Sequence, residues 1–104
     1  MRRLLSTTEA PSPAAATQFA AERAWRLNPQ VALRDEAFGA LAYHYGNRRL
    51  TFLRDAALVS LVRDLGRHPS VDDALEAASI DVARRPSFRK ALGALASSEV
   101  IRAR

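Results

Sequence analysis

The sequence predicts a small α+β domain in which the strands come first and the helices follow. Between Trp25 and Leu53 the apolar residues fall in three short alternating runs, a pattern typical of β-strands. From Asp55 onward they recur at helical spacing. Because 104 residues suffice for one domain, we expect a winged helix-turn-helix-like fold, with a three-stranded antiparallel sheet followed by three helices.

Residues 1–24 are expected to form a disordered tail, and residues 25–104 the folded domain. Residues 6–17 are small and polar and are interrupted by Pro11 and Pro13. Such a segment buries too little apolar surface to offset the entropy of ordering. Residues 18–24 are expected to add at most a turn or two of helix around Phe19. The charged start of the chain has no apolar stretch behind it, so we expect no signal peptide.

The first strand is expected to be bent or broken, because residues 25–27 and 31–34 alternate on either side of Asn28-Pro29, a dipeptide that marks a turn. The second strand is predicted over residues 38–45. Alternation places its large residues on one face, which we expect to pack against the helices: Leu41, Tyr43 and Tyr45. The other face then exposes the imidazole of His44.

A hairpin is predicted after the second strand. Gly46-Asn47 suits a two-residue type II′ turn, because glycine tolerates the positive φ of its first corner. The third strand then covers residues 48–53, with Leu50 and Phe52 on one face. As the last strand before the helices, it is expected to leave an edge open to a partner.

Three helices are predicted in the second half of the chain. Asp55 caps the first, which ends at Gly66 and turns inward the residues Leu58, Leu61, Val62 and Leu65. Ser70 caps a short second helix whose inward residues are Val71, Ala74, Leu75 and Ala78. Ile80 and Val82 are expected to fill the connection to a third helix. That helix begins at Pro86-Ser87 and carries an apolar stripe of Phe88, Leu92 and Leu95. Val100 and Ile101 are expected to pack against the helices.

The composition limits the possible functions. The net charge is +5, and of the 16 basic residues only Lys90 is a lysine. Arginine with abundant alanine is compatible with the codon usage of a GC-rich genome, yet a basic protein still prefers an acidic peptide or nucleic acid as partner. The absence of cysteine excludes disulfides and thiolate-held metal clusters and fits a cytoplasmic protein.

No catalytic or metal site is expected. The two histidines, His44 and His68, have no acidic or thiol neighbours at ligand spacing. No nucleophile and base stand together in the sequence, and a domain this small rarely forms a deep catalytic cleft. We therefore expect a recognition module without a cofactor, and not an enzyme.

Three segments of the chain resemble the PqqD-like family. They are Leu-Asn-Pro-Gln-Val-Ala-Leu-Arg at 27–34, Phe-Gly-Ala-Leu-Ala-Tyr-His-Tyr-Gly at 38–46 and Arg-Leu-Thr-Phe-Leu at 49–53. The second segment is the most specific, and it resembles the branch of the family that serves mycofactocin biosynthesis. The resemblance covers about residues 25–101, and its helical half matches only by pattern. Ser97-Ser98-Glu99 departs from it, because many members have a glycine near the end of the last helix.

The resemblance implies a RiPP recognition element, a peptide chaperone that supplies no chemistry itself. It would hold the leader of the precursor peptide MftA for the radical SAM enzyme MftC. The leader would dock as an added strand along the third strand, in a groove made with the third helix. The residues that this implies for peptide binding are Arg48, Arg49, Leu50, Thr51, Phe52, Leu53, Arg85, Phe88, Arg89, Leu92, Leu95 and Ala96.

Other interpretations of the same residues stay open at this point. The apolar members of that set are equally compatible with an ordinary core. Arg48 and Arg49 also suit the protection of an edge strand against aggregation. A winged-helix DNA-binding regulator is the alternative function, with Arg84, Arg85, Arg89 and Lys90 against phosphates. A protein that scaffolds or inhibits a folded enzyme through the same edge is a third possibility.

Overall fold

The structure is a computed structural model that describes residues 5–7 and 19–104. Two short 3-10 helices, η1 (Leu65–Arg67) and η2 (Val82–Arg84), flank α2. The strands are β1 (Leu5–Thr7), β2 (Trp25–Leu27), β3 (Val31–Glu36), β4 (Gly39–His44), β5 (Leu50–Leu53) and β6 (Ile101–Ala103). The helices are α1 (Ala56–Asp64), α2 (Val71–Ala77) and α3 (Arg85–Ser97). Within the described part of the chain, no helix combines the length and the apolarity needed to cross a membrane.

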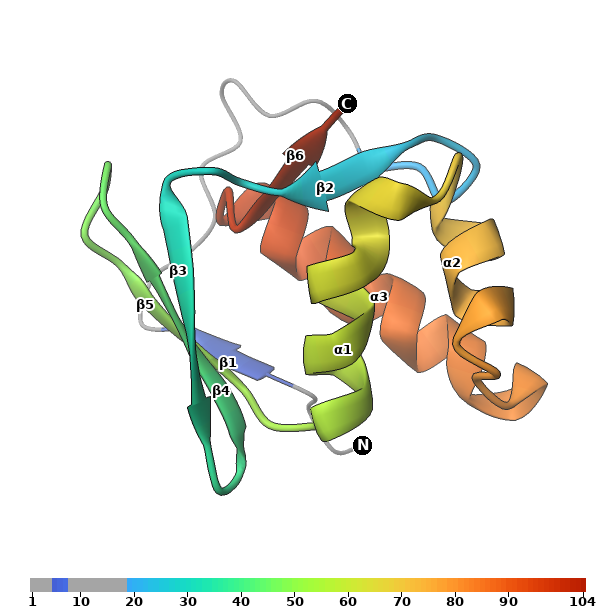
Figure 1. Ribbon diagram of the computed structural model, residues 1–104, viewed down its shortest axis with the longest axis horizontal. Coiled ribbons are helices and arrows are strands. Elements are labelled where there is room, and N and C mark those ends of the chain that lie inside the picture. The colour runs from blue at the N-terminus through green and yellow to red at the C-terminus, as the bar shows by residue number, and fades with distance from the viewer. Residues whose placement is uncertain (1–4, 8–18) are drawn as a thin grey trace.

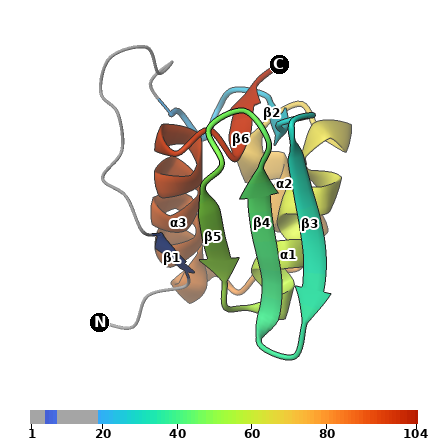
Figure 2. The same cartoon turned by 90° about the vertical axis from the view of Figure 1, so that its left-hand side faces the viewer.

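The predicted fold class is confirmed. Strands β3, β4 and β5 form an antiparallel meander, and the three helices follow it in the chain (Figure 1). The helices lie on one side of this sheet, and α1 is the helix that packs most closely against β4 and β5. Figure 2 shows the sheet face on, with β1 next to β5 on the side away from β4, so that the strand order is β1-β5-β4-β3.

The first predicted strand is in fact two strands in different sheets. β2 pairs with β6 near the C-terminus, with Trp25 opposite Ala103 and Leu27 opposite Ile101. The chain then turns at Asn28-Pro29 and enters β3. The expectation that Ile101 merely packs against the helices was incomplete, because its backbone belongs to β6. Pairing of β2 with β6 buries both Trp25 and Ile101 in the core.

The faces of β4 are the reverse of the prediction. Ala40, Ala42 and His44 point into the core and are at most 4% exposed, while Leu41 and Tyr43 lie half-buried on the outer face. Small alanine side chains allow α1 to approach β4 closely, which larger residues would prevent. Alternation of the strand was therefore predicted correctly, and the choice of face was wrong.

The hairpin between β4 and β5 is longer than predicted. The backbone N–H of His44 donates to the carbonyl of Arg49 at 3.0 Å, and that of Arg48 donates to the carbonyl of His44 at 2.7 Å. The positive φ, 62°, falls at Arg48 and not at Gly46. The two-residue type II′ turn was therefore wrong, and the third strand begins at Leu50 instead of Arg48.

The helices follow their predicted caps and stripes. Asp55 Oδ1 accepts hydrogen bonds from the N–H groups of Ala57 and Leu58 at 2.8 and 3.2 Å. Ser70 Oγ accepts one from Asp73 N–H at 3.0 Å. The predicted apolar stripes of α1 and α3 are buried throughout. Two details were wrong: Ala78 is exposed, and Val82 is 71% exposed in η2 instead of filling the connection.

The end of α3 explains the departure from the family pattern. Val100 N–H donates to the carbonyl of Leu95 at 2.8 Å and Glu99 N–H to that of Ala96 at 3.1 Å, the two bonds of a Schellman motif. Glu99 adopts a φ of 66° in this motif. It therefore occupies the left-handed position that normally favours glycine.

The N-terminal segment differs from the expected tail where the structure describes it. Leu5–Thr7 forms β1, and the chain is folded again from Phe19. The rings of Phe19 and Trp25 lie 5.2 Å apart, and Trp25 Nε1–H donates to the carbonyl of Ala20 at 3.1 Å. Residues 19–24 form turns rather than a helix. The rest of the predicted tail, residues 1–4 and 8–18, lies outside the described residues.

Candidate functional site

The backbone of β5 can pair with strands on both sides. Thr51 and Leu53 lie opposite Ala42 and Ala40 of β4, in phase with the hydrogen-bonded pair of His44 and Arg49. Hydrogen-bonded pairs alternate with non-bonded pairs along an antiparallel ladder. Leu50 and Phe52 therefore direct their N–H and C=O groups to the opposite edge of β5.

That opposite edge is occupied by β1 of the same chain. Leu5, Ser6 and Thr7 lie antiparallel to β5, opposite Leu53, Phe52 and Thr51 in turn. By the same alternation, Ser6 and Phe52 form the hydrogen-bonded pair of this short ladder. The β5 edge thus accepts an added extended segment, which is the property that the sequence predicts for the third strand.

The predicted peptide-binding residues of β5 and its loop divide by face. Arg48, Leu50 and Phe52 are exposed, and Arg49 is half-buried. Leu50 and Phe52 are 39% and 36% exposed on the outer face of the sheet. Thr51 and Leu53 point into the core and are at most 1% exposed. Their side chains cannot contact a peptide laid along this edge, so they contribute only backbone and packing.

The predicted residues of α3 lie away from the solvent or in other contacts. Phe88, Leu92 and Leu95 are fully buried and Ala96 is 6% exposed, with β1 in place. The strand against which α3 packs is β6, at the end of the chain. The expected groove between the third strand and the third helix is therefore not lined by these side chains, which belong to the core of the domain.

Arginines at the start of α3 are engaged within the chain. Arg89 Nε donates to a carboxylate oxygen of Asp72 at 3.0 Å, and Arg85 Nε donates to the carbonyl of Ile80 at 2.9 Å. Arg84 forms an ion pair with Asp55 at 2.9 Å, and its guanidinium carbon lies 4.9 Å from the centre of the Phe88 ring. These contacts tie α3 to α1, α2 and the preceding loop.

The outer face of the sheet carries an aromatic cluster that the sequence analysis did not single out. The rings of Phe38 and Phe52 lie 5.7 Å apart. The guanidinium carbon of Arg54 lies 5.8 and 5.3 Å from the centres of these two rings. Because Phe52 is itself an edge position of β5, this cluster borders the backbone groups that face β1. Alternation in residues 38–54 was the signal that could have revealed it.

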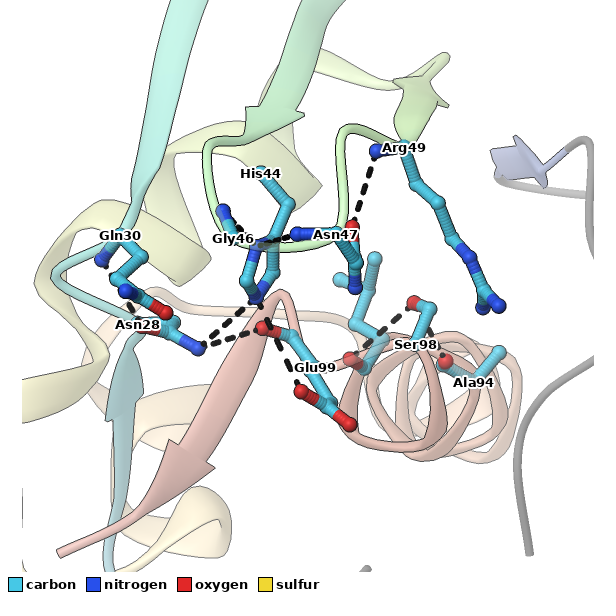
Figure 3. Close-up of polar contacts among 10 residues, drawn as sticks. Asn28, Gln30, His44, Gly46, Asn47, Arg49, Ala94, Ser98 and Glu99 are labelled. Atoms are coloured by element: carbon cyan, nitrogen blue, oxygen red, sulfur yellow. Dashed lines mark hydrogen bonds and ion pairs between the residues drawn. The ribbon is translucent and has the colours of Figure 1, made fainter.

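A buried polar cluster closes the other end of the β4–β5 hairpin, as Figure 3 shows. His44 Nδ1 accepts hydrogen bonds from the N–H groups of Gly46 at 3.0 Å and Asn47 at 3.2 Å. A ring nitrogen that accepts two N–H groups carries no proton, so the proton of the neutral imidazole lies on Nε2. The expected exposed imidazole was wrong, since His44 is only 4% exposed.

The same cluster joins three distant parts of the chain. Asn28 Nδ2 donates to the backbone carbonyl of Glu99 at 2.9 Å and lies 3.4 Å from His44 Nε2 (Figure 3). Asn28 Oδ1 accepts a hydrogen bond from Gln30 N–H at 2.9 Å. The start of β3, the β4–β5 hairpin and the end of α3 are thereby held together, which keeps β5 in place. This role of His44 is structural.

No chemical centre is present among the described residues. They include no group of three or more histidine, cysteine, aspartate or glutamate side chains placed to hold a metal ion. What the arrangement can do is bind: an edge of β5 with backbone groups at Leu50 and Phe52, bordered by exposed aromatic and basic side chains.

The comparisons with known proteins agree with this geometry. The model of the peptide chaperone MftB family matches residues 24–102. The peptide chaperone MftB of Mycobacterium ulcerans (strain Agy99) is 45% identical over 97% of this chain and 94% of its own length. That of Mycobacterium tuberculosis (strain H37Rv) is 38% identical over 88% of both chains, and that of Mycolicibacterium smegmatis 41% over 80% and 81%. No solved structure matches the chain. The chain therefore belongs to the peptide chaperone MftB family, whose members are named as chaperones and not as enzymes.

Proposed function

We propose that this chain binds the leader of the precursor peptide MftA as an added strand along β5 and delivers it to the radical SAM enzyme MftC. The observation that carries the proposal is the antiparallel pairing of β1 with β5. An edge that accepts three residues of its own chain has the backbone geometry to accept a peptide. Membership of the peptide chaperone family supports the same occupant.

The side chains around the edge suit such a peptide. Successive residues of an added strand point to opposite faces, so alternate leader residues would lie over the outer face beside Leu50 and Phe52. Their exposed apolar area offers anchoring contacts. Exposed Arg48 near the start of β5, together with the net charge of +5, favours leader carboxylates.

The expected affinity follows from a few contacts. About four backbone hydrogen bonds at ~1 kcal/mol each and two apolar anchors at ~2 kcal/mol each oppose an ordering cost of ~2 to 5 kcal/mol. The outcome depends strongly on how well the leader is preorganised. We expect a dissociation constant from about 10 nM to 1 μM.

The structure does not favour the DNA-binding alternative. Arg84, Arg85 and Arg89, at the start of α3, already contact Asp55, the carbonyl of Ile80 and Asp72. Contact with phosphates would have to replace these interactions, which weakens the case for α3 as a recognition helix.

The test is isothermal titration of the full chain with a synthetic MftA leader at two salt concentrations, beside a random DNA duplex. Saturable binding of the leader with little salt dependence is expected. Binding of the duplex alone, with a steep loss of affinity at high salt, would refute the proposal. Delivery is tested separately, by measuring turnover of full-length MftA by MftC with and without this chain. No gain in turnover would restrict the proposal to leader binding.

A further inference from the structure

The edge of β5 can pair with only one strand at a time. Phe52 directs its N–H and C=O to that edge, and β1 places Ser6 opposite them. A leader bound by strand addition needs the same backbone groups. Resting on the proposed function, we infer that β1 is an internal competitor of the leader, so that the leader binds only when the N-terminal strand leaves the β5 edge.

The short length of β1 makes its release feasible. β1 contains three residues and β5 four, and Ser6 with Phe52 is the one hydrogen-bonded pair of the ladder. A longer leader strand can use the groups of Leu50 as well as those of Phe52. The leader therefore gains backbone bonds that β1 does not make, which allows it to displace β1.

The folded domain does not depend on β1 for its N-terminal boundary. Phe19 packs against Trp25 and would lie 3.6 Å from a Cβ placed on Gly93 of α3. Two backbone bonds hold the next residues: Val71 N–H donates to the carbonyl of Arg23 at 3.2 Å, and Asp72 N–H to that of Ala21 at 3.1 Å. Release of β1 thus changes the β5 edge while the chain from Phe19 onward keeps its contacts.

The connection also keeps β1 close to the edge after release. Eleven residues, 8–18, join Thr7 to Phe19 in the sequence. A tether of this length gives an effective concentration in the range of about 1 mM or above. If the edge is closed in about 90% of molecules, the apparent leader affinity falls about tenfold, because only the open fraction binds.

The competition can be tested in the full chain by opening and by locking β1. Ser6→Pro removes the N–H that pairs with Phe52, and we expect it to raise leader affinity about tenfold. Thr7→Cys with Thr51→Cys closes the edge, since these positions form a non-bonded pair, whose Cα atoms are typically ~4.5 Å apart and thus within disulfide range. The chain has no other cysteine. We expect the oxidised form to bind no leader and the reduced form to recover.

Two controls complete the experiment. Thr51→Cys alone should bind the leader like the unmodified chain, which separates the lock from an effect on the core. Hydrogen exchange without leader should show the amide of Phe52 exchanging faster in Ser6→Pro. Unchanged exchange would overturn the pairing on which the inference rests.

The outcomes distinguish this inference from the proposed function. Equal leader affinity of the unmodified, Ser6→Pro and locked chains would overturn the competition and leave leader binding standing. No leader binding by any form, the reduced double variant included, would overturn both. Tighter binding by Ser6→Pro together with a lock that reduction reverses would establish β1 as the competitor.

Discussion

The side chain of Asn28 donates a hydrogen bond of 2.9 Å to the backbone carbonyl of Glu99, although the two residues are 71 positions apart. Asn28 is 6% exposed and lies between β2 and β3, whereas Glu99 ends the last helix. This bond, together with the contact of Asn28 to His44, joins the two ends of the domain at the β4–β5 hairpin.

Asn28→Ala should lower the free energy of unfolding by about 2 kcal/mol, because it leaves the Glu99 carbonyl and the Gln30 N–H without their partner. Urea denaturation followed by circular dichroism measures the change. Asn47→Ala is the matched control, since Asn47 Oδ1 accepts a single exposed hydrogen bond from Arg49 N–H. Equal effects of the two substitutions would contradict the structural role of Asn28.

Gly39→Ala should destabilise the domain by about 3 kcal/mol. Gly39 has a φ of 145°, and a Cβ there would overlap the backbone carbonyl oxygen of Leu53. Gly93→Ala provides the contrast, because its Cβ would meet Phe19 at an ordinary 3.6 Å inside α3. That variant should gain about 0.5 to 1 kcal/mol. Thermal unfolding of both proteins decides, and a tolerated alanine at position 39 would argue against this β3–β4 turn.

Glu99→Gly should raise stability by about 0.5 to 1 kcal/mol, since glycine adopts the φ of 66° without the cost that a Cβ imposes. The ion pair lost with the carboxylate is long, 4.0 Å to His44 Nε2, and Glu99 is exposed. Ala94→Gly inside α3 should instead cost about 1 kcal/mol. Denaturant titration of both variants checks the opposite signs. A loss of stability in Glu99→Gly would mean that its side chain matters more than its backbone.

Phe52→Pro should weaken leader binding at least tenfold while the domain stays folded, because the proline removes an N–H at the outer edge of β5. Thr51→Pro should unfold the protein, since Thr51 is paired with Ala42 of β4. Titration with the MftA leader, accompanied by circular dichroism, measures both effects. Phe52→Ala keeps the N–H and serves as the control for loss of the ring. Undiminished binding by a folded Phe52→Pro protein would exclude strand addition at this edge.

Leu92→Asp should unfold the domain rather than remove leader binding selectively. Leu92 is fully buried, and a carboxylate in its place has no partner, at a cost of about 4 kcal/mol or more. Lys90→Asp on the exposed side of α3 should change stability by less than about 0.5 kcal/mol. Circular dichroism of the two proteins distinguishes the roles. A folded Leu92→Asp protein that no longer bound the leader would return Leu92 to the peptide site.

Local patterns in the sequence determined the elements of this fold. Asp55 and Ser70 begin α1 and α2 as predicted, because a capping side chain needs only the N–H groups two or three residues ahead. The stripe of Phe88, Leu92 and Leu95 is buried as its spacing requires. The alternating runs became β2 to β5, and the edge position of the third predicted strand is the feature on which the proposed site depends.

Contacts between distant residues were decided only by the tertiary structure. Alternation shows that Ala42 and Tyr43 lie on opposite faces of β4, but only the packing of α1 determines which face is buried. Likewise, nothing local in Leu5–Thr7 or Ile101–Ala103 indicates their partners, which lie 48 positions away for Leu5 and Leu53. A three-residue strand has too little intrinsic preference to be recognised alone, because its stability comes from the edge with which it pairs.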